Sequence, residues 1–419
     1  MNRRDFLLRI PAAAAAIAIA RRTRASEPGP SGALRDTASA PASPPDSARA
    51  EAQRSQFPAA LIAAAGDTTL GYNLEAHFDA LAASGISKDL LFSLYFSGVR
   101  EILEWADLAM VNLECPFTER GEPLPKNFNF RARRELVEIL RSGAVDAVTL
   151  ANNHLMDFGE IGLSDTIDTL DDAKILHFGA GRDLDAARRP LIVERAGVRL
   201  GFIGYYFQDA RDMREPRELY AAANRPGVAG CYTDLYCMRS MLDRDLAKLV
   251  PQVEAAIPFF HWGHEGSSEV RDYQIELAHR SVDLGCRAVL GAHPHRLQAI
   301  EVYRGAPVFY SLGNFVFGGN KDPEDKLSAI ARLRVPKSGP VDADVVPIQI
   351  TRWPDAAFQP FALEGEDKAA ALARIAQISR GFDATLPQLA GASEEFGIGA
   401  EEFGIGAAAP VDSASTPHR

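Results

Sequence analysis

The sequence predicts a layered α/β domain, and two patterns support this prediction. Short apolar runs recur along the middle of the 419-residue chain, and each ends in polar residues, which is typical of strands buried on both faces of a sheet. Segments with apolar residues at helical spacing lie between several of these runs. Strand and helix patterns that alternate in this way predict a sheet whose faces are covered by helices.

The first 25 residues are expected to be a twin-arginine export signal. Arg3 and Arg4 precede a short, mildly apolar, alanine-rich segment. A membrane anchor is the alternative, but about 11 apolar residues are too few for a bilayer that needs about 20. We expect cleavage after Ala25, export by the twin-arginine machinery to the periplasm or the cell exterior, and no stable transmembrane anchor afterwards. Residues 26–56 are rich in Ser, Pro and Ala and read as a disordered linker.

The main domain is expected over residues 57–355. Its apolar runs, in chain order, are LIAAAGD (61–67), ADLAMVNLE (106–114), VDAVTLANNH (145–154), LGFIGYY (200–206), AAIPFFHWGHE (255–265) and RAVLGAHPH (287–295). The helical patterns are RRELVEILRSG (133–143), IGLSDTIDTLDDA (161–173) and YQIELAHRSVDLG (273–285). Gly143 and Gly285 stand where a helix often ends in a left-handed residue.

Three later apolar segments, 308–317, 327–335 and 345–353, have no helical pattern between them and are expected to pair antiparallel. Residues 356–419 are expected to be a mostly mobile extension. This extension contains EEFGIGA at 394–400 and an identical copy at 401–407.

Composition limits the partners and the chemistry. The net charge of −11 argues against nucleic acid as a partner, because phosphate binding needs a basic surface. No C-x-x-C pair is present, which argues against a structural zinc site. Cys231 and Cys237 are close in a tyrosine-rich segment that we expect to be an exposed loop, and they are a plausible disulfide. Cys286 is expected to be a small core residue.

Potential metal ligands follow almost every apolar run. They are Asp67, Asn112, Glu114, Asn152, Asn153, His154, His261, His264, Glu265, His293 and His295. Ligands of parallel sheets collect at the carboxyl ends of the strands, and imidazole, carboxylate and amide oxygens together suit a divalent Mn, Zn or Fe ion. Residues i and i+2 of a strand point to one side, so His293 and His295 are expected to face the same ligand.

Several motifs, in order, resemble the CapA-type family of poly-γ-glutamate capsule biosynthesis, which is similar in fold to the calcineurin-like metallophosphoesterases. Roughly between residues 58 and 320 they are GDTTLG, NLECPFT, TLANNHLMDFGEIGLSDTIDTL, HFGAG, HWGHE, GAHPHRLQAIEVYRG and YSLGNFVF. The resemblance implies a four-layer α/β/β/α metallophosphoesterase-like sandwich. It also implies a metal site at one edge of the two sheets.

The resemblance also implies individual roles. The residues at metal-ligand positions are Asp67, Asn153, His261, His293 and His295, and His154 matches a catalytic histidine. Glu114 is a further metal-ligand candidate, although it stands where a bridging aspartate would be expected. The metallophosphoesterase pattern begins with Asp-x-His, whereas Thr69 stands at the histidine position here. One histidine ligand is therefore missing, and both one and two metal ions remain open.

Neighbouring residues have two interpretations each. Asp157 either orients the imidazole of His154 or caps the helix that begins near Gly159. His264 and Glu265 either compensate for the missing ligand or shape a substrate pocket. Asn112 and Asn314 are candidate substrate contacts, although a turn or bulge is the preferred interpretation of Asn314. Trp262 fits substrate stacking, but core packing is the commoner role of a tryptophan at a strand end.

Three functions follow from these assignments. The first is an exported CapA-type hydrolase with one or two divalent ions, acting on or beside an anionic polymer such as poly-γ-glutamate at an amide or phosphoester bond. The second is a non-enzymatic component of capsule assembly or polymer retention. The third is a general periplasmic metallophosphoesterase. An acidic chain that binds an acidic polymer needs a metal or a local basic patch, for which Arg131, Arg133 and Arg134 are candidates.

Overall fold

A computed structural model of the chain describes residues 58–383. The expected export signal, the linker up to residue 56 and the duplicated EEFGIGA segment lie outside these residues. Within them, strands and helices alternate through most of the chain, so the predicted α/β class is confirmed. No helix among residues 58–383 is both long enough and apolar enough to cross a membrane.

The larger sheet has the order β16-β15-β14-β1-β2-β3-β4, and β13 pairs with the end of β1. Its strands are β1 (Ala59–Thr69), β2 (Leu108–Leu113), β3 (Ala147–Thr149), β4 (Leu176–Phe178), β13 (Asn314–Phe317), β14 (Leu327–Pro336), β15 (Asp342–Gln349) and β16 (Phe361–Ala362). β1 to β4 are parallel to one another, whereas β14, β15 and β16 extend the sheet in antiparallel fashion.

The smaller sheet has the order β10-β9-β7-β6. Its strands are β6 (Leu191–Arg195), β7 (Val198–Phe207), β9 (Ala255–Trp262) and β10 (Leu290–Ala292). Two short pairs complete the strands: β5 (Ala180–Gly181) with β8 (Gly227–Val228), and β11 (Ile300–Tyr303) with β12 (Ala306–Phe309). β7, β9 and β10 are parallel, so their carboxyl ends lie at the same edge.

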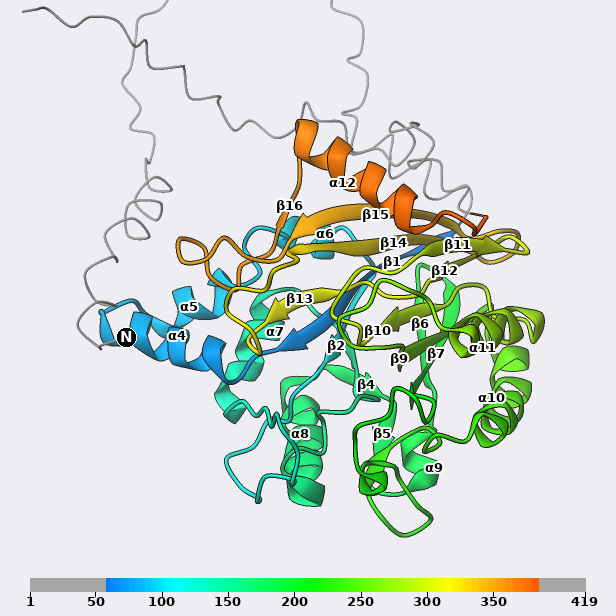
Figure 1. The fold of residues 1–419 in the computed structure, drawn as a ribbon, viewed down its shortest axis with the longest axis horizontal. Helices are drawn as coiled ribbons and strands as arrows, with labels where there is room; N and C mark the ends of the chain where they lie inside the picture. Colours follow the sequence, from blue (N-terminus) through cyan, green and yellow to red (C-terminus); the bar gives the residue numbers. More distant parts are fainter. Residues whose placement is uncertain (1–57, 384–419) are drawn as a thin grey trace, which may run out of the picture.

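Helices cover the outer faces of the sheets (Figure 1). They are α4 (Asn73–Ala83), α5 (Lys88–Leu94), α6 (Arg100–Glu104), α7 (Val137–Ser142), α8 (Gly159–Ala173), α9 (Leu184–Ala187), α10 (Leu235–Leu249), α11 (Asp272–Asp283) and α12 (Gly365–Ile378). In Figure 1, α4 and α5 lie at the left and α10 and α11 at the right, with the strands between them.

Alternation along the strands divides the core into three clusters. Ala63 and Ala65 of β1 face the helices α4, α5, α7 and α8, whereas Ile62 and Ala64 face β7, β9 and β10 of the other sheet. A third cluster joins the outer face of β7 and β9 to α10 and α11. The two sheets therefore share one apolar layer, and the edges at which their parallel strands end come together.

Several local expectations need correction. Segment 308–317 is divided between β12 and β13, and β13 pairs with β1 in parallel rather than antiparallel. Gly143 has a φ of −85°, and Ala144 takes the left-handed conformation after α7 with a φ of 59°. A Cβ at Gly143 would lie 2.4 Å from the ring of Phe96, so close packing is what requires glycine there. Gly285 is left-handed as predicted, with a φ of 101°.

Part of the expected C-terminal extension belongs to the folded domain. Residues 356–383 contain β16 and α12, and α12 lies beside β15 in Figure 1. Ala371 and Ile375 of α12 are buried, and Ile375 joins the layer between the sheets. The apolar residues of α12 thus close one end of this layer.

Cys231 and Cys237 form a disulfide with an S–S distance of 2.07 Å. Their surroundings differ from the expected exposed loop, because Cys231 is buried and Cys237 lies in the first turn of α10. Cys286 is buried in the third cluster, as predicted.

Candidate metal centre

The candidate ligands of both sheets meet where the parallel strands end. The larger sheet supplies Asp67 from β1, Glu114 immediately after β2 and Asn153 after β3. The smaller sheet supplies His261 from β9 and, after β10, the pair His293 and His295. All six side chains are largely withdrawn from solvent.

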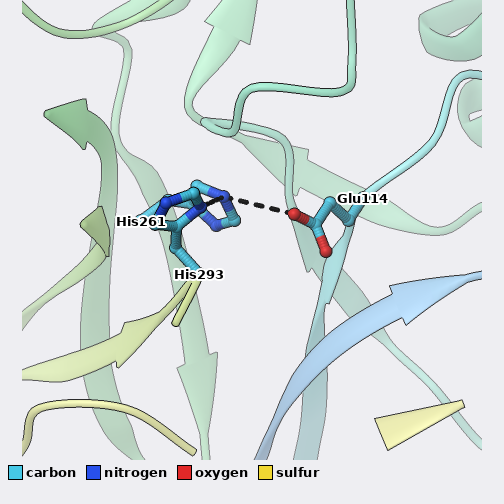
Figure 2. A group of neighbouring side chains, drawn as sticks. All are labelled: Glu114, His261 and His293. Atoms are coloured by element: carbon cyan, nitrogen blue, oxygen red, sulfur yellow. Dashed lines mark hydrogen bonds and ion pairs between the residues drawn. The ribbon is translucent and has the colours of Figure 1, made fainter. Parts of the chain in front are cut away.

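One group of ligands centres on His261. The Nε2 atom of His261 lies 2.9 Å from His293 Nδ1, 2.8 Å from Asn153 Oδ1 and 3.3 Å from Glu114 Oε1. Glu114, His261 and His293 each offer a ligand atom, and these atoms lie within 4.8 Å of one another. Figure 2 shows the two imidazoles and the carboxylate turned toward a common point. Together with the amide oxygen, this group provides four potential ligands.

A second group shares Glu114 and adds Asp67 and His295, again within 4.8 Å. Asp67 Oδ2 lies 3.1 Å from His295 Nδ1, and Glu114 Oε1 lies 4.0 Å from His295 Nε2. Thr69, at the position of the missing histidine, donates its hydroxyl to the backbone oxygen of Glu114 at 3.1 Å. The second group therefore has three potential ligands among the described residues, one fewer than the first group.

The surroundings of Glu114 fit a bound cation. The side chain is fully buried, and neither carboxylate oxygen accepts a hydrogen bond from the described residues. Burying a carboxylate without such partners is costly. Burial, followed by repulsion from Asp67, raises the pKa of Glu114 well above its usual range. A divalent cation between the two ligand groups would supply the missing partner.

The histidines are electrostatically prepared for the same role. Burial, reinforced by neighbouring imidazoles, lowers the pKa of both His261 and His293 well below the usual value. Both are therefore neutral near pH 7, which is the form that binds metal. Burial opposes a charge on His295 as well, but Glu114 and Asp67 outweigh it and raise the pKa of His295 to about 10. A cation at this position would have to replace the proton on His295.

The His-Pro-His segment reaches the site through a turn. β10 ends at Ala292, and His293 and His295 have left-handed φ values of 100° and 54°. The prediction that strand alternation aims both imidazoles is therefore wrong. Left-handed conformations cost non-glycine residues about 1–3 kcal/mol each and persist where the surroundings hold them. Here the amide of His293 donates to Asp67 Oδ2 at 3.1 Å, and His295 Nδ1 lies 2.8 Å from Asn314 Oδ1.

His154 lies beside the first ligand group and is held by Asp157. His154 Nδ1 lies 2.7 Å from Asp157 Oδ2, which also accepts the amide of Phe130 at 2.6 Å. The N-cap of α8 is Phe158, without a side-chain cap, so the interpretation of Asp157 as a helix cap is wrong. Burial lowers the pKa of His154, although Asp157 acts in the opposite direction. The neutral imidazole donates Nδ1–H to Asp157, and its Nε2 has no hydrogen-bond partner within residues 58–383.

A cavity of about 270 Å³ opens next to the first ligand group. Its lining consists of Asn153, Gln208, Asp212, Arg214, Glu215, His264, Glu265, Gly266 and His293. The side chain of His264 is 44% exposed and lies 3.1 Å from Asp212. His264 and Glu265 are thus at the pocket and outside both ligand groups, which favours pocket shaping over replacement of the missing ligand.

The comparisons with known proteins agree with these motifs. The family model described as "Bacterial capsule synthesis protein PGA_cap" matches residues 61–319. The chain belongs to this family.

Two curated relatives of this PGA_cap member come from Bacillus. The chain is 28% identical over 258 residues to the "PGA biosynthesis protein CapA" of Bacillus subtilis (strain 168), and the match covers 61% of this chain and 64% of that protein. It is 29% identical over 259 residues to the "Capsule biosynthesis protein CapA" of Bacillus anthracis, covering 61% of each. The chain thus spans less than two thirds of the length of these relatives.

A third relative is a "Probable polyglutamine synthesis accessory protein" of Mycobacterium tuberculosis (strain H37Rv). It is 31% identical over 255 residues, and the match covers 58% of this chain and 65% of that protein. A crystal structure of a hypothetical protein from Thermus thermophilus aligns with a TM-score of 0.40 and 18% identity, covering 68% of this chain and 99% of the other.

Three candidate substrate contacts lie away from the pocket lining of this PGA_cap member. Asn112 is fully buried and donates to Asp67 Oδ1 at 2.7 Å. Asn314 lies where the register of β1 and β13 shifts, which fits the expected bulge, and it contacts His295. Both asparagines therefore support ligands from behind. Trp262 is buried against Phe260 and donates to a backbone oxygen, so the packing interpretation is confirmed.

The expected basic patch does not form, because two of its arginines have acidic partners. Arg133 pairs with Glu75, Asp79 and Glu135, and Arg134 pairs with Asp172 at 3.4 Å. The guanidinium of Arg131 lies over the ring of Phe158 at 4.4 Å.

Sequence reasoning missed three residues at the site: Lys126, Gln208 and Glu215. Gln208 Nε2 lies 2.8 Å from His293 Nε2 and donates to the oxygen of Gly263 at 2.8 Å. Lys126 lies 3.1 Å from Glu215. Lys126 and Glu215 belong to irregular segments, so no strand end or periodicity marks them. Gln208 immediately follows β7, and its position after an apolar run was the available signal.

Proposed function

We propose that this PGA_cap member is a metal-dependent hydrolase that acts on poly-γ-glutamate or a related anionic capsule polymer. The observation that carries the proposal is the fully buried Glu114 carboxylate, which has no hydrogen-bond donor among residues 58–383 and is set between two groups of metal-ligand type. The names of the Bacillus relatives, which refer to PGA and capsule biosynthesis, support the substrate class. The bond cleaved is an amide or a phosphoester.

The donor set supports a divalent Mn, Zn or Fe ion. Asn153, His261, His293 and Glu114 would hold a first ion, and Asp67, Glu114 and His295 a second one. Because Thr69 replaces a histidine, the second position has fewer protein ligands, and we propose that it binds more weakly. The three apolar clusters also support assignment of the domain to the four-layer α/β/β/α sandwich of the metallophosphoesterases.

The bound metal would supply a nucleophile from water at neutral pH and polarise the scissile bond. Asp157 holds the imidazole of His154 by Nδ1, and Nε2 takes up and releases the proton. Because burial lowers the pKa of His154, a proton at Nε2 is weakly held and passes readily to a leaving oxygen or nitrogen. The pocket side chains His264, Glu265 and Arg214 contact the polymer.

We further propose that the chain acts outside the cytoplasm, in the periplasm or beyond. The Arg3–Arg4 pattern and the alanine-rich segment after it support export by the twin-arginine machinery. That route carries folded proteins, which suits a protein that acquires its metal before export.

A second candidate is a non-enzymatic role in capsule assembly, in which the metal grips carboxylates of the polymer. Thr69 favours this candidate because it leaves the second group one ligand short. Turnover separates the two roles: hydrolysis of poly-γ-glutamate or a phosphoester, reduced about 10²–10⁴-fold by His154→Ala, supports the enzyme. Phosphoester turnover without any effect on the polymer would indicate a general metallophosphoesterase instead.

The direct test is the metal content of residues 26–419 by elemental analysis, with His293→Ala and Glu114→Ala beside the natural chain. We expect one to two equivalents, reduced in both variants. His177→Ala is the matched control, because His177 pairs only with the exposed Asp171 among the described residues and belongs to neither ligand group. Metal content unchanged by His293→Ala would refute the site.

A further inference from the structure

We propose that Lys126 and Glu215 are positioning residues that fix both a metal ligand, Asn153, and the proton-transfer residue, His154. This inference rests on the proposed metal-dependent function. It assigns a role to two residues that carry no recognisable motif and that come from irregular segments far apart in the sequence.

Lys126 is a buried cation whose contacts all belong to this site. Its side chain is 7% exposed, and Nζ lies 2.6 Å from Asp157 Oδ1 and 3.1 Å from Glu215 Oε2. Nζ also donates to the backbone oxygen of Asn153 at 2.8 Å. The ammonium thus forms one hydrogen bond, to Asn153, and two ion pairs, to Asp157 and Glu215, and it also lies 3.4 Å from His154 Nδ1. A buried charge with this arrangement holds its partners in one geometry, because losing a contact is costly.

Glu215 determines which end of the Asn153 amide faces the metal centre. Glu215 Oε1 accepts from Asn153 Nδ2 at 3.4 Å, while Oε2 is held by Lys126. A carboxylate only accepts hydrogen bonds, so it selects the amino end of the amide. The opposite end, Oδ1, is thereby directed to the first ligand group, 2.8 Å from His261 Nε2. Partners of this kind orient metal ligands in proteins.

Lys126 also fixes the carboxylate that holds His154. It occupies Oδ1 of Asp157, which leaves Oδ2 for His154 Nδ1 at 2.7 Å and the amide of Phe130. Lys126 therefore contacts both Asn153 and the carboxylate that holds His154, whereas Glu215 contacts only Asn153 of these two. Removing either residue should disturb Asn153, and only removal of Lys126 should also disturb His154 directly.

This difference gives the two variants different signatures. We expect Lys126→Met and Glu215→Ala each to weaken Mn²⁺ binding about 10–100-fold, as for other residues that orient metal ligands. The double variant should bind about as weakly as Lys126→Met alone, because both act on Asn153. With saturating Mn²⁺, kcat should fall further in Lys126→Met than in Glu215→Ala.

The experiment is a calorimetric Mn²⁺ titration of residues 26–419, with a Co²⁺ absorption spectrum as a report on coordination. Asn153→Ala defines the signal of a lost amide ligand, and both positioning variants should reproduce its spectral change. Lys88→Met is the control, because Lys88 makes an exposed pair with Glu135 and is 56% exposed. Thermal unfolding checks that each variant is folded.

The outcomes separate two failures. If the natural chain binds no stoichiometric Mn²⁺, the proposed function fails and this inference fails with it. If the natural chain binds Mn²⁺ and Asn153→Ala weakens it, while Glu215→Ala keeps the natural affinity and spectrum, only the positioning role is overturned. The Glu215 variant decides the question even if Lys126→Met does not fold, because Glu215 lies at the pocket and its side chain is 13% exposed.

Discussion

Replacing Glu114 by Gln should make the metal-free protein more stable and the metal-loaded protein less stable than the natural chain. Without a cation, the Glu114 carboxylate is buried with no hydrogen-bond donor from the described part of the chain. A glutamine of the same shape carries no charge, so it avoids the cost of burying an ionised carboxylate at this position. Relief of an unsatisfied buried group is worth about 1–3 kcal/mol. For a folded domain of this size, that raises Tm by about 1.5–4.5 °C.

Metal reverses the order of the two proteins. At a free metal concentration of 1,000 times Kd, binding stabilises the natural chain by about 4.1 kcal/mol, or about 6 °C in Tm, which exceeds the metal-free difference. The Glu114→Gln protein loses a ligand of both groups and should gain little. Scanning calorimetry with a chelator and then with Mn²⁺ measures both values.

The metal-free difference also has a defined pH dependence. Burial, together with Asp67, raises the pKa of Glu114 in the folded protein above its unfolded value. A raised carboxyl pKa gives stability that is present below the unfolded pKa and lost as pH rises through the folded pKa. The advantage of Glu114→Gln should therefore grow as pH rises. A metal-free variant at pH 8 with a Tm equal to or below that of the natural chain would refute the reasoning.

Glu301 provides a matched control for this experiment. It is also a buried glutamate, but it accepts hydrogen bonds from Tyr310 at 2.7 Å and lies 3.0 Å from His279. Glu301→Gln should lower Tm with and without Mn²⁺ to the same extent.

Three further predictions concern other residues. Burial lowers the pKa of His77 to about 4, so folding stability should fall as pH drops from about 6.5 to 4. His77→Gln should remove about 3 kcal/mol of that loss, measured in urea titrations at acid pH. His264→Ala should raise KM for the polymer and change kcat less than about threefold, because His264 lines the pocket outside both ligand groups. A loss in kcat as large as the rise in KM would contradict this assignment. Thr69→His should increase bound Mn²⁺ by up to about one equivalent, since it adds the histidine ligand that the second group lacks. Elemental analysis that shows no increase in a folded variant would argue against a second metal position.

The sequence was sufficient to predict the α/β class and most strands because their apolar runs are long and buried on both faces. It was also sufficient to collect the ligand candidates, since each follows such a run. The sequence did not predict the local backbone geometry at the site. The left-handed conformations of His293 and His295 depend on contacts with Asp67 and Asn314. Periodicity carries no information on contacts of that kind.

Lys126 and Glu215 show a second limit. Each lies in an irregular segment, and each reads in isolation as an ordinary surface charge. Their burial is set by where the two segments meet over Asn153, which no local pattern encodes. The predicted basic patch was wrong because it also depended on contacts between distant segments. The acidic partners of Arg133 lie in α4, which is remote in sequence but adjacent in space.

The division of ligands between the sheets explains why the site lies where it does. The larger sheet provides the two carboxylates and the amide, Asp67, Glu114 and Asn153, whereas the smaller sheet provides the imidazoles of His261, His293 and His295. Because His261 and His293 are neutral when buried, they neutralise little of the negative charge that faces them. A divalent cation shared by both sheets would balance this charge while bonding to both. The same ion would therefore hold together the edges of the two sheets and supply the proposed chemistry, so stability and activity should depend on one binding event.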